Sequence, residues 1–209
     1  MKLVCNNVFD HLAGDYDKWF YENDKIFDSE VLAVSSLLEK DTEYYDIGCG
    51  TGIFSSRLNL KKGVEPSEEM AAFAKKRGME VLRGTAQNMP FEADSRQGLV
   101  MITVDCFIED IEAIYSEAHR VLKKGGHMIF AFLDAATPLG ELYESTKSES
   151  EYYRNAIFRP AKTRNELLKK HGFEVTDSKQ TVFTQENVPQ EVKDGLGEGL
   201  FAVIKAVKL

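Results

Sequence analysis

The apolar positions of this chain fall into short continuous runs that alternate with helical stripes. Residues 44–47 and 99–104 form runs of strand length, and the second is almost entirely apolar. Such a run is typical of a parallel strand that is covered on both faces. Between the runs, apolar residues recur every three or four positions, which predicts amphipathic helices. Together these patterns predict one α/β domain.

Helix and strand signals divide most of the chain into elements. Asp28 is expected to cap a helix that runs to Lys40, and Ser67 to cap a second one. A third helix should begin at the capping box that Thr163 opens and end at Gly172. The predicted strands are residues 44–47, 62–65, 79–83, 99–104, 127–133, 173–175 and 201–207, with further strand material at 181–183.

A glycine-rich segment follows the first predicted strand. Gly48, Gly50 and Gly52 would turn the chain sharply into a helix that carries Phe54. Without side chains, the loop lets a ligand approach the backbone, and the N–H groups that open the helix favour negative charge. A dinucleotide fingerprint would need glycine where this chain has Ile53. The loop is therefore predicted to hold another ligand, with a plain turn of some other α/β protein as the alternative.

The Gly-x-Gly-x-Gly loop with Asp46 before it resembles the first motif of class I S-adenosylmethionine-dependent methyltransferases. The resemblance implies that the loop, Cys49 included, holds the methionine and ribose parts of the cofactor. A second landmark follows, in which a strand ends at Glu65 before Pro66 and a helix carrying Met70. The Glu65 carboxylate is expected to accept hydrogen bonds from the ribose hydroxyls. An exposed strand-end glutamate is the alternative.

The segment after the third predicted strand resembles the part of these methyltransferases that encloses the adenine. Thr85, Ala86 and Gln87 stand where the family commonly has Asp-Ala-Glu. A hydroxyl or amide can still accept from the adenine amine, but it forms a weaker bond than a carboxylate. Arg96 and Gln97 likewise replace a common Phe-Asp pair. These departures keep open a catalytically silent, cofactor-binding regulatory protein as the alternative to an enzyme.

The resemblance extends over residues 9–133 and is closest to small-molecule methyltransferases of the ubiquinone/menaquinone-biosynthesis type. It implies a Rossmann-like, doubly wound sheet of seven strands, mostly parallel with an antiparallel last strand. Ligands of such sheets bind beyond the carboxyl ends of the strands, so Thr103 should face the cofactor. We expect a single domain, 1–209, divided into an N-terminal lid (1–27), a cofactor-binding core (28–133), a substrate-side insert (134–161) and a C-terminal helix with strands (162–209).

Aromatic residues gather in two segments outside the core. Tyr16 and Trp19 belong to an N-terminal segment that resembles a lid over the cofactor, with Tyr16 as the expected contact. A helix packed on the domain by its apolar face is an equal alternative. The insert carries Tyr143 and Tyr153 among many charges. These aromatics either shape the acceptor pocket or anchor a surface helix.

Methyl transfer from a sulfonium is an in-line displacement, so the protein mainly aligns the acceptor and excludes water. A base is needed only where the acceptor must lose a proton. Asp105, after the fourth strand, and His11, in the expected lid, are the candidate catalytic residues. Asp105 as a cap or solvent-facing residue is the alternative. Residues 104–107 lack the Asn-Pro-Pro-Tyr-like motif of the branch that modifies DNA and protein amines, which favours a small-molecule acceptor.

Charge and composition limit the kinds of partner and ligand that are expected for this chain. Acidic residues outnumber basic ones by 34 to 26, and the net charge of −8 argues against nucleic acid. A chain of 209 residues with 43% hydrophobic content suits one well-filled domain. The three cysteines and four histidines lack ligand spacing, so we expect no metal and no disulfide framework. Without a membrane span or signal peptide, a cytoplasmic monomer or homodimer is expected.

Overall fold

The computed structural model describes residues 8–209, with side chains from residue 14 onward. The α-helices are α1 (Val8–Glu22), α2 (Asp24–Ser35), α3 (Ile53–Arg57), α4 (Glu68–Lys76), α5 (Glu112–Val121), α6 (Pro138–Thr146) and α7 (Ala161–Lys170), and the short 3-10 helices are η1 (Asp105–Phe107) and η2 (Lys147–Glu149). The strands are β1 (Tyr44–Ile47), β2 (Lys62–Val64), β3 (Glu80–Leu82), β4 (Arg96–Ile102), β5 (Leu122–Leu133), β6 (Phe173–Thr181), β7 (Lys193–Asp194) and β8 (Phe201–Lys208).

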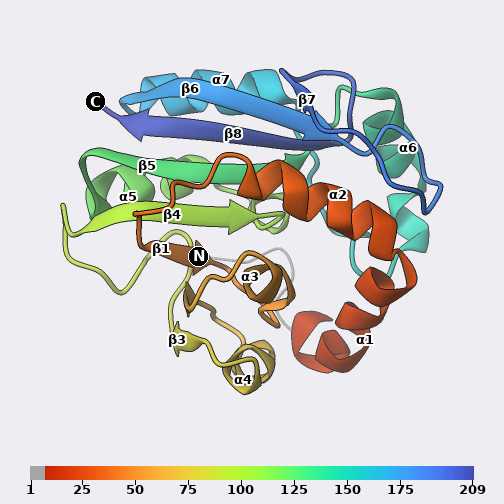
Figure 1. Ribbon diagram of the computed structural model, residues 1–209, viewed down its shortest axis with the longest axis horizontal. Helices are drawn as coiled ribbons and strands as arrows, with labels where there is room; N and C mark the ends of the chain where they lie inside the picture. Colours follow the sequence, from red (N-terminus) through yellow and green to blue (C-terminus); the bar gives the residue numbers. More distant parts are fainter. Residues whose placement is uncertain (1–7) are drawn as a thin grey trace.

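The strands form one sheet in the order β3-β2-β1-β4-β5-β8-β6-β7 (Figure 1). β1 to β5 pair in parallel, whereas β8 runs antiparallel to both β5 and β6. This confirms the predicted mostly parallel sheet with an antiparallel last strand. The predicted count of seven is one short, because β7 adds an eighth strand at the edge. Its two residues are Lys and Asp, so no apolar run announced it.

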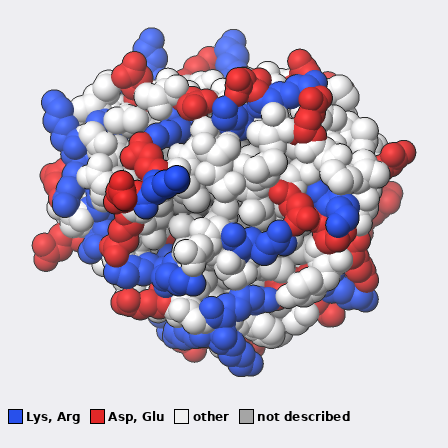
Figure 2. All heavy atoms as spheres, in the orientation of Figure 1, with Lys and Arg blue, Asp and Glu red and all other residues white. Residues whose placement is uncertain are grey.

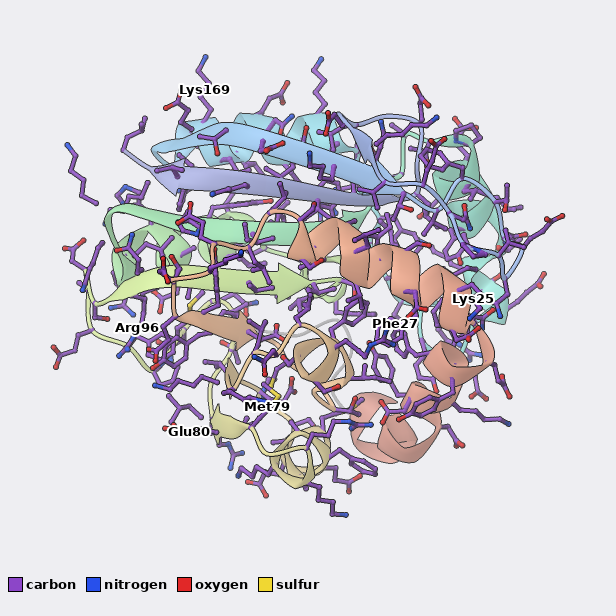
Figure 3. All side chains as sticks on the ribbon, viewed as in Figure 1. Lys25, Phe27, Met79, Glu80, Arg96 and Lys169 are labelled. Carbon is purple, nitrogen blue, oxygen red and sulfur yellow. The ribbon has the colours of Figure 1, made fainter. Side chains whose placement is uncertain are left out.

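Two apolar cores lie on opposite faces of the sheet. α5 and α7 pack on one face through Ile114 and Leu168, both fully buried. Phe20 of α1, Phe27 of α2 and Phe54 of α3 pack on the other. Figure 3 shows Phe27 pointing from α2 toward α3, and its ring centroid lies 4.8 Å from that of Phe54. Burying each such side chain contributes about 1.5–3 kcal/mol, so these rings hold the helices against the sheet.

The second helix begins earlier than its capping signal predicted. α2 starts at Asp24 rather than Asp28, and it ends at Ser35 rather than Lys40. No side chain at its N-cap bonds the first turn. Instead, the Asn187 side chain accepts the Lys25 N–H at 2.9 Å. A residue more than 150 positions away thus satisfies a helix-end donor, which no local pattern reveals.

The capping predictions for α4 and α7 had opposite outcomes. The Ser67 hydroxyl accepts the Met70 N–H at 3.2 Å, which confirms Ser67 as the N-cap of α4. α7 begins at Ala161, so the prediction that Thr163 caps it is wrong. The Ala161 N–H donates instead to the buried Asp134 carboxylate at 3.0 Å. Asp134 follows β5, and this contact ties the start of α7 to the end of that strand.

The described surface carries charges of both signs. Acidic and basic side chains alternate around the face in Figure 2 without separating into two large regions. No helix within residues 8–209 has the length and apolar character that a membrane span requires.

Candidate active site

The chain turns sharply between β1 and α3 through three glycines in the left-handed region. The φ angles of Gly48, Gly50 and Gly52 are +76°, +53° and +75°, values that side chains disfavour. A Cβ on Gly48 would meet Val104 at 2.6 Å, and one on Gly52 would meet Met79 at 2.7 Å. Nothing lies within 4 Å of a Cβ on Gly50. The outer glycines therefore let the loop pack tightly, while open space remains over the central one.

Two buried carboxylates lie beside this loop. Glu65, directly after β2, accepts the N–H groups of Gly50 at 2.8 Å and Ser67 at 2.9 Å. Its exposed fraction is 8%, so it is not the exposed strand-end residue of the alternative reading. Asp46 in β1 accepts a hydrogen bond from the Ser55 hydroxyl. Burial raises the pKa of Asp46 to about 7, although the Ser55 bond opposes the rise.

The segment after β3 forms a tight turn. The Asn88 N–H donates to the Thr85 carbonyl at 3.1 Å, and the Thr85 N–H donates back at 3.3 Å. Ala86 is buried within the turn, and Thr85 and Gln87 are half-buried. The turn leaves the sheet at the carboxyl end of β3, the same edge as the glycine loop.

A cavity of about 470 Å³ lies beyond the carboxyl ends of β4 and β5. Thr103 follows β4 and Leu133 ends β5, and both line it. Of the predicted cofactor residues, Tyr16 and Thr103 are on its wall. The insert contributes Leu139, Tyr143, Tyr152 and Tyr153. This supports the prediction that its aromatic residues shape the acceptor pocket. The aromatic lining comprises Tyr16, Trp19, Phe20, Phe54, Phe107, Tyr143, Tyr152 and Tyr153.

Two β-branched residues on the cavity wall have a strained backbone. The φ angles of Thr103 and Val182 are +52° and +63°, a conformation that costs on the order of 1–3 kcal/mol each. Thr103 donates its N–H to Ala131 at 2.8 Å, and the Val182 carbonyl accepts from Leu200 at 2.9 Å. The surrounding sheet thus holds both residues in place. Strain of this kind clusters at functional sites.

α1 is fastened to the glycine loop while it covers the cavity. The Thr51 hydroxyl donates to Asp17 at 2.6 Å. Arg77, directly after α4, donates to both the Asp17 carboxylate and the Thr51 carbonyl. Tyr16 and Trp19, which are on α1 like Asp17, line the cavity. The two sequence alternatives for this segment are therefore compatible, since the helix packs on the domain and also walls the site.

Known proteins are similar to this chain in sequence and in fold. A family model described as a methyltransferase domain matches residues 45–130. An uncharacterized protein of Methanocaldococcus jannaschii is 40% identical over 97% of this chain and 100% of its own length. A solved structure from Thermotoga maritima, described as an S-adenosylmethionine-dependent methyltransferase and possible histamine N-methyltransferase, has a TM-score of 0.92 at 40% identity and covers 97% of this chain and 99% of its own. The chain belongs to the S-adenosylmethionine-dependent methyltransferase family.

A curated relative with a named pathway is more distant. The ubiquinone/menaquinone biosynthesis C-methyltransferase of Campylobacter jejuni is 27% identical over 84% of this methyltransferase and 92% of its own length. The loop described above is compatible with the cofactor of the family. It offers open space over Gly50 and buried carboxylate oxygens that accept hydrogen bonds. Within the described chain, no group of three or more His, Cys, Asp or Glu residues is arranged to hold a metal ion.

The predicted catalytic carboxylate of the methyltransferase does not line the cavity. Asp105 is 1% exposed, and it accepts a hydrogen bond from Arg164 Nε at 2.9 Å. Arg164 Nη2 lies 2.6 Å from the same oxygen. This buried pair joins η1 to α7, a structural task that argues against Asp105 as a base. His11 lies outside the residues whose side chains are described.

The sequence reasoning missed a glutamate that does line the cavity. Glu30 of α2 is 7% exposed. Burial raises its pKa to about 8, and no hydrogen bond to its carboxylate is found among the described residues. A signal was available, because Glu30 shares the helical spacing of the buried Phe27 and Val34. An acid on the apolar stripe of a helix is rarely buried without a reason.

One departure from the family pattern has a structural explanation. The Arg96 guanidinium lies over the rings of Tyr45 at 4.8 Å and Phe91 at 4.5 Å, and it donates to the Tyr45 hydroxyl. Arg96 begins β4, whereas the cavity lies beyond the other end of that strand. In this methyltransferase, Arg96 therefore stabilises the sheet at the end of β4 that lies opposite the cavity, and it does not line the cavity.

Proposed function

We propose that this protein transfers the methyl group of S-adenosylmethionine to a small-molecule acceptor held in the 470 Å³ cavity. One observation carries the proposal. Tyr16 and Thr103, which the family resemblance assigns to the cofactor, also line the cavity. A ligand in the cavity and a cofactor against the glycine loop would therefore lie next to each other. A cavity of this size accommodates a metabolite rather than a polymer.

The glycine loop and Glu65 hold the methionine and ribose parts of the cofactor in this proposal. A carboxylate has about four lone-pair sites, so the amide bonds that Glu65 accepts are compatible with bonds from ribose hydroxyls. When bound, the cofactor supplies an electron-poor methyl carbon. The residues that would surround it are Tyr16, Asp46, Gly48, Cys49, Gly50, Gly52, Glu65, Pro66, Met70, Thr85, Ala86, Gln87 and Thr103.

The remaining work of the chain is alignment and exclusion of water. α1, tied to the loop through Asp17 and Thr51, keeps Tyr16 and Trp19 over the cavity. The aromatic side chains of the cavity wall leave water few partners there, which favours an organic acceptor over solvent. The bond from the Thr103 N–H to the Ala131 carbonyl holds one wall in place, which helps the alignment that in-line transfer requires.

The named relatives point to different acceptor chemistries. The Thermotoga maritima protein is described in terms of histamine, which offers basic nitrogens. The Campylobacter jejuni protein is described as a C-methyltransferase. Both descriptions fit a small acceptor, and neither fits a nucleic acid or a protein side chain.

A metabolite screen for S-adenosylhomocysteine formation tests the proposal. Amines, phenols, quinones and thiols should be included, and we expect at least one to be methylated. Leu139→Trp, which fills the cavity, should abolish turnover while leaving S-adenosylhomocysteine affinity unchanged. Leu142→Trp, an exposed position of the same helix, is the matched control.

The rival candidate is a silent, cofactor-binding regulatory protein. Its support is that Thr85 and Gln87 are neutral where the family commonly has acids. It predicts tight S-adenosylhomocysteine binding by calorimetry with no turnover of any acceptor. In that case, Leu139→Trp and the wild type would be indistinguishable in every assay of methyl transfer.

A further inference from the structure

Glu30 is the buried acid of the cavity, and no side chain from residue 14 onward forms a hydrogen bond or ion pair with it. Its exposed fraction is 7%, and it faces a space also lined by Tyr16, Tyr143 and Tyr153. Among the described residues, none donates a hydrogen bond to its carboxylate. Burying an unpaired carboxyl group is costly. Packing by itself does not explain why an acid occupies this position.

The other ionisable groups of the cavity do not neutralise Glu30. Lys147 is the basic residue in the described lining, but its ammonium group contacts Glu144 at 2.7 Å and donates to the Ala156 carbonyl at 2.9 Å. Glu149 is exposed at the rim. The tyrosines from α1, α6 and the insert remain neutral, because burial raises the pKa of each hydroxyl, and Glu30 adds to the rise. The cavity therefore presents an acid that lacks a cation.

The walls around this acid are aromatic. Tyr and Trp ring faces attract organic cations, and the attraction strengthens where water is excluded. Trp19 is 38% exposed and lies on the wall, where a ligand can reach it. A carboxylate combined with aromatic faces matches a small amine better than a phenol, a thiol or a carbon acid.

We propose that Glu30 binds the basic nitrogen of an amine acceptor in the cavity and takes up its proton. The proposal rests on the methyl-transfer function proposed above. When the ammonium ion binds, protonated Glu30 gives its own proton to solvent. The carboxylate then forms one O–H bond as one N–H bond of the ammonium breaks, and the electron pair stays on nitrogen. The neutral amine is then nucleophilic, and no oxidant or metal is needed. Because burial raises the pKa of Glu30 to about 8, its affinity for a proton suits this exchange near neutral pH.

A direct test uses the full chain without cofactor. The probes are benzylamine, 2-phenylethylamine and histamine, each paired with the alcohol that replaces its primary amine. Trp19 fluorescence reports binding, and calorimetry in two buffers reports proton release. We expect at least one amine to bind more tightly than its alcohol, by about 10- to 100-fold. Since Glu30 is protonated at pH 7, binding of an ammonium ion should release about one proton.

Variants separate recognition from folding. Glu30→Gln keeps the size and neutrality of the protonated acid, so we expect it to fold. It should lose about 10- to 100-fold in amine affinity, lose the proton release, and bind the alcohol within about threefold of the wild type. Glu141→Gln, which changes an exposed acid of α6 that does not line the cavity, should behave as the wild type.

Two results would overturn the proposal. One is that no amine of the panel binds more tightly than its alcohol. The other is that Glu30→Gln keeps full amine affinity. The methyl-transfer function is judged separately by S-adenosylhomocysteine binding and by the metabolite screen. If both succeed with a non-basic acceptor that Glu30→Gln methylates at the wild-type rate, only the role of Glu30 is lost. If the wild type fails to bind S-adenosylhomocysteine, the proposed function is lost, and the amine titrations still decide on Glu30.

Discussion

The Glu30→Gln variant should become more stable than the wild type by a margin that grows as the pH rises. An ordinary glutamate has a pKa of 4.5, whereas burial raises that of folded Glu30 to about 8. Between these values, the unfolded chain has lost the proton that the folded chain keeps. Unfolding is therefore favoured increasingly as pH increases. The stabilising effect of the folded pKa is complete below pH 4.5 and is lost as pH rises through 8.

The size of the effect follows from the two pKa values. The two pKa values, 8 and 4.5, differ by 3.5. A pKa difference of one corresponds to about 1.4 kcal/mol, so the whole difference amounts to about 5 kcal/mol. Glu30→Gln removes this dependence and leaves all other titrations in place. Relative to the wild type, the variant should gain about 5 kcal/mol in free energy of unfolding between pH 4 and pH 9, with no further gain above pH 9.

Urea unfolding at a series of pH values measures this difference. The free energy of unfolding in water is obtained for both proteins by linear extrapolation, and only the difference between them is interpreted. Glu141→Gln, which removes one exposed carboxylate of α6, is measured beside it as the control. Parallel curves for Glu30→Gln and the wild type would show that Glu30 ionises normally, and the argument from burial would fail.

Four further outcomes are expected. Glu65→Gln should weaken S-adenosylhomocysteine binding by calorimetry, because hydrogen bonds to a charged acceptor contribute about 1.5–3 kcal/mol; an unchanged affinity would remove Glu65 from the ribose site. Arg164→Met should lower the free energy of unfolding by about 3–5 kcal/mol, since it leaves Asp105 buried without its partner, and adding Asp105→Asn should recover most of the loss in urea titrations. Trp19 fluorescence should change on titration with S-adenosylhomocysteine, and an unresponsive Trp19 would place it outside the bound site. Methyl transfer should persist in EDTA, and a loss that one divalent ion restores would contradict a metal-free reaction.

Local patterns were sufficient for the elements that have strong periodicity or an obligatory glycine. The apolar run at 99–104 overlaps β4, and the residues of β4 from 98 to 102 are buried, as predicted for a strand covered on both faces. The three glycines of the loop have left-handed φ angles that few other residues adopt. Ser67 caps α4 because its partner is three residues away. In each case the interaction that decides the structure lies within a few residues, so the sequence records it.

Predictions failed where the deciding partner is distant in the chain. The start of α2 is set by Asn187 and that of α7 by Asp134, rather than by Asp28 or Thr163. A helix N-terminus needs acceptors for its first N–H groups, and any nearby oxygen can supply them. The sequence shows which residues are suitable caps. It does not show which one the fold brings to the helix.

The family can be recognised from local segments of the sequence, whereas the chemistry of the acceptor site depends on long-range contacts. The order of glycine loop, strand-end acid and strands identifies the cofactor, because these contacts come from consecutive segments of the chain. The cavity is assembled from α1, α2, α6 and the segment after β6, so its contents depend on packing. Asp105 follows a cofactor strand but is paired with Arg164, whereas Glu30 on a helix outside the motifs faces the cavity. Which acid is neutralised and which one lacks a partner among the described residues depends on long-range contacts, and only the tertiary structure decides it.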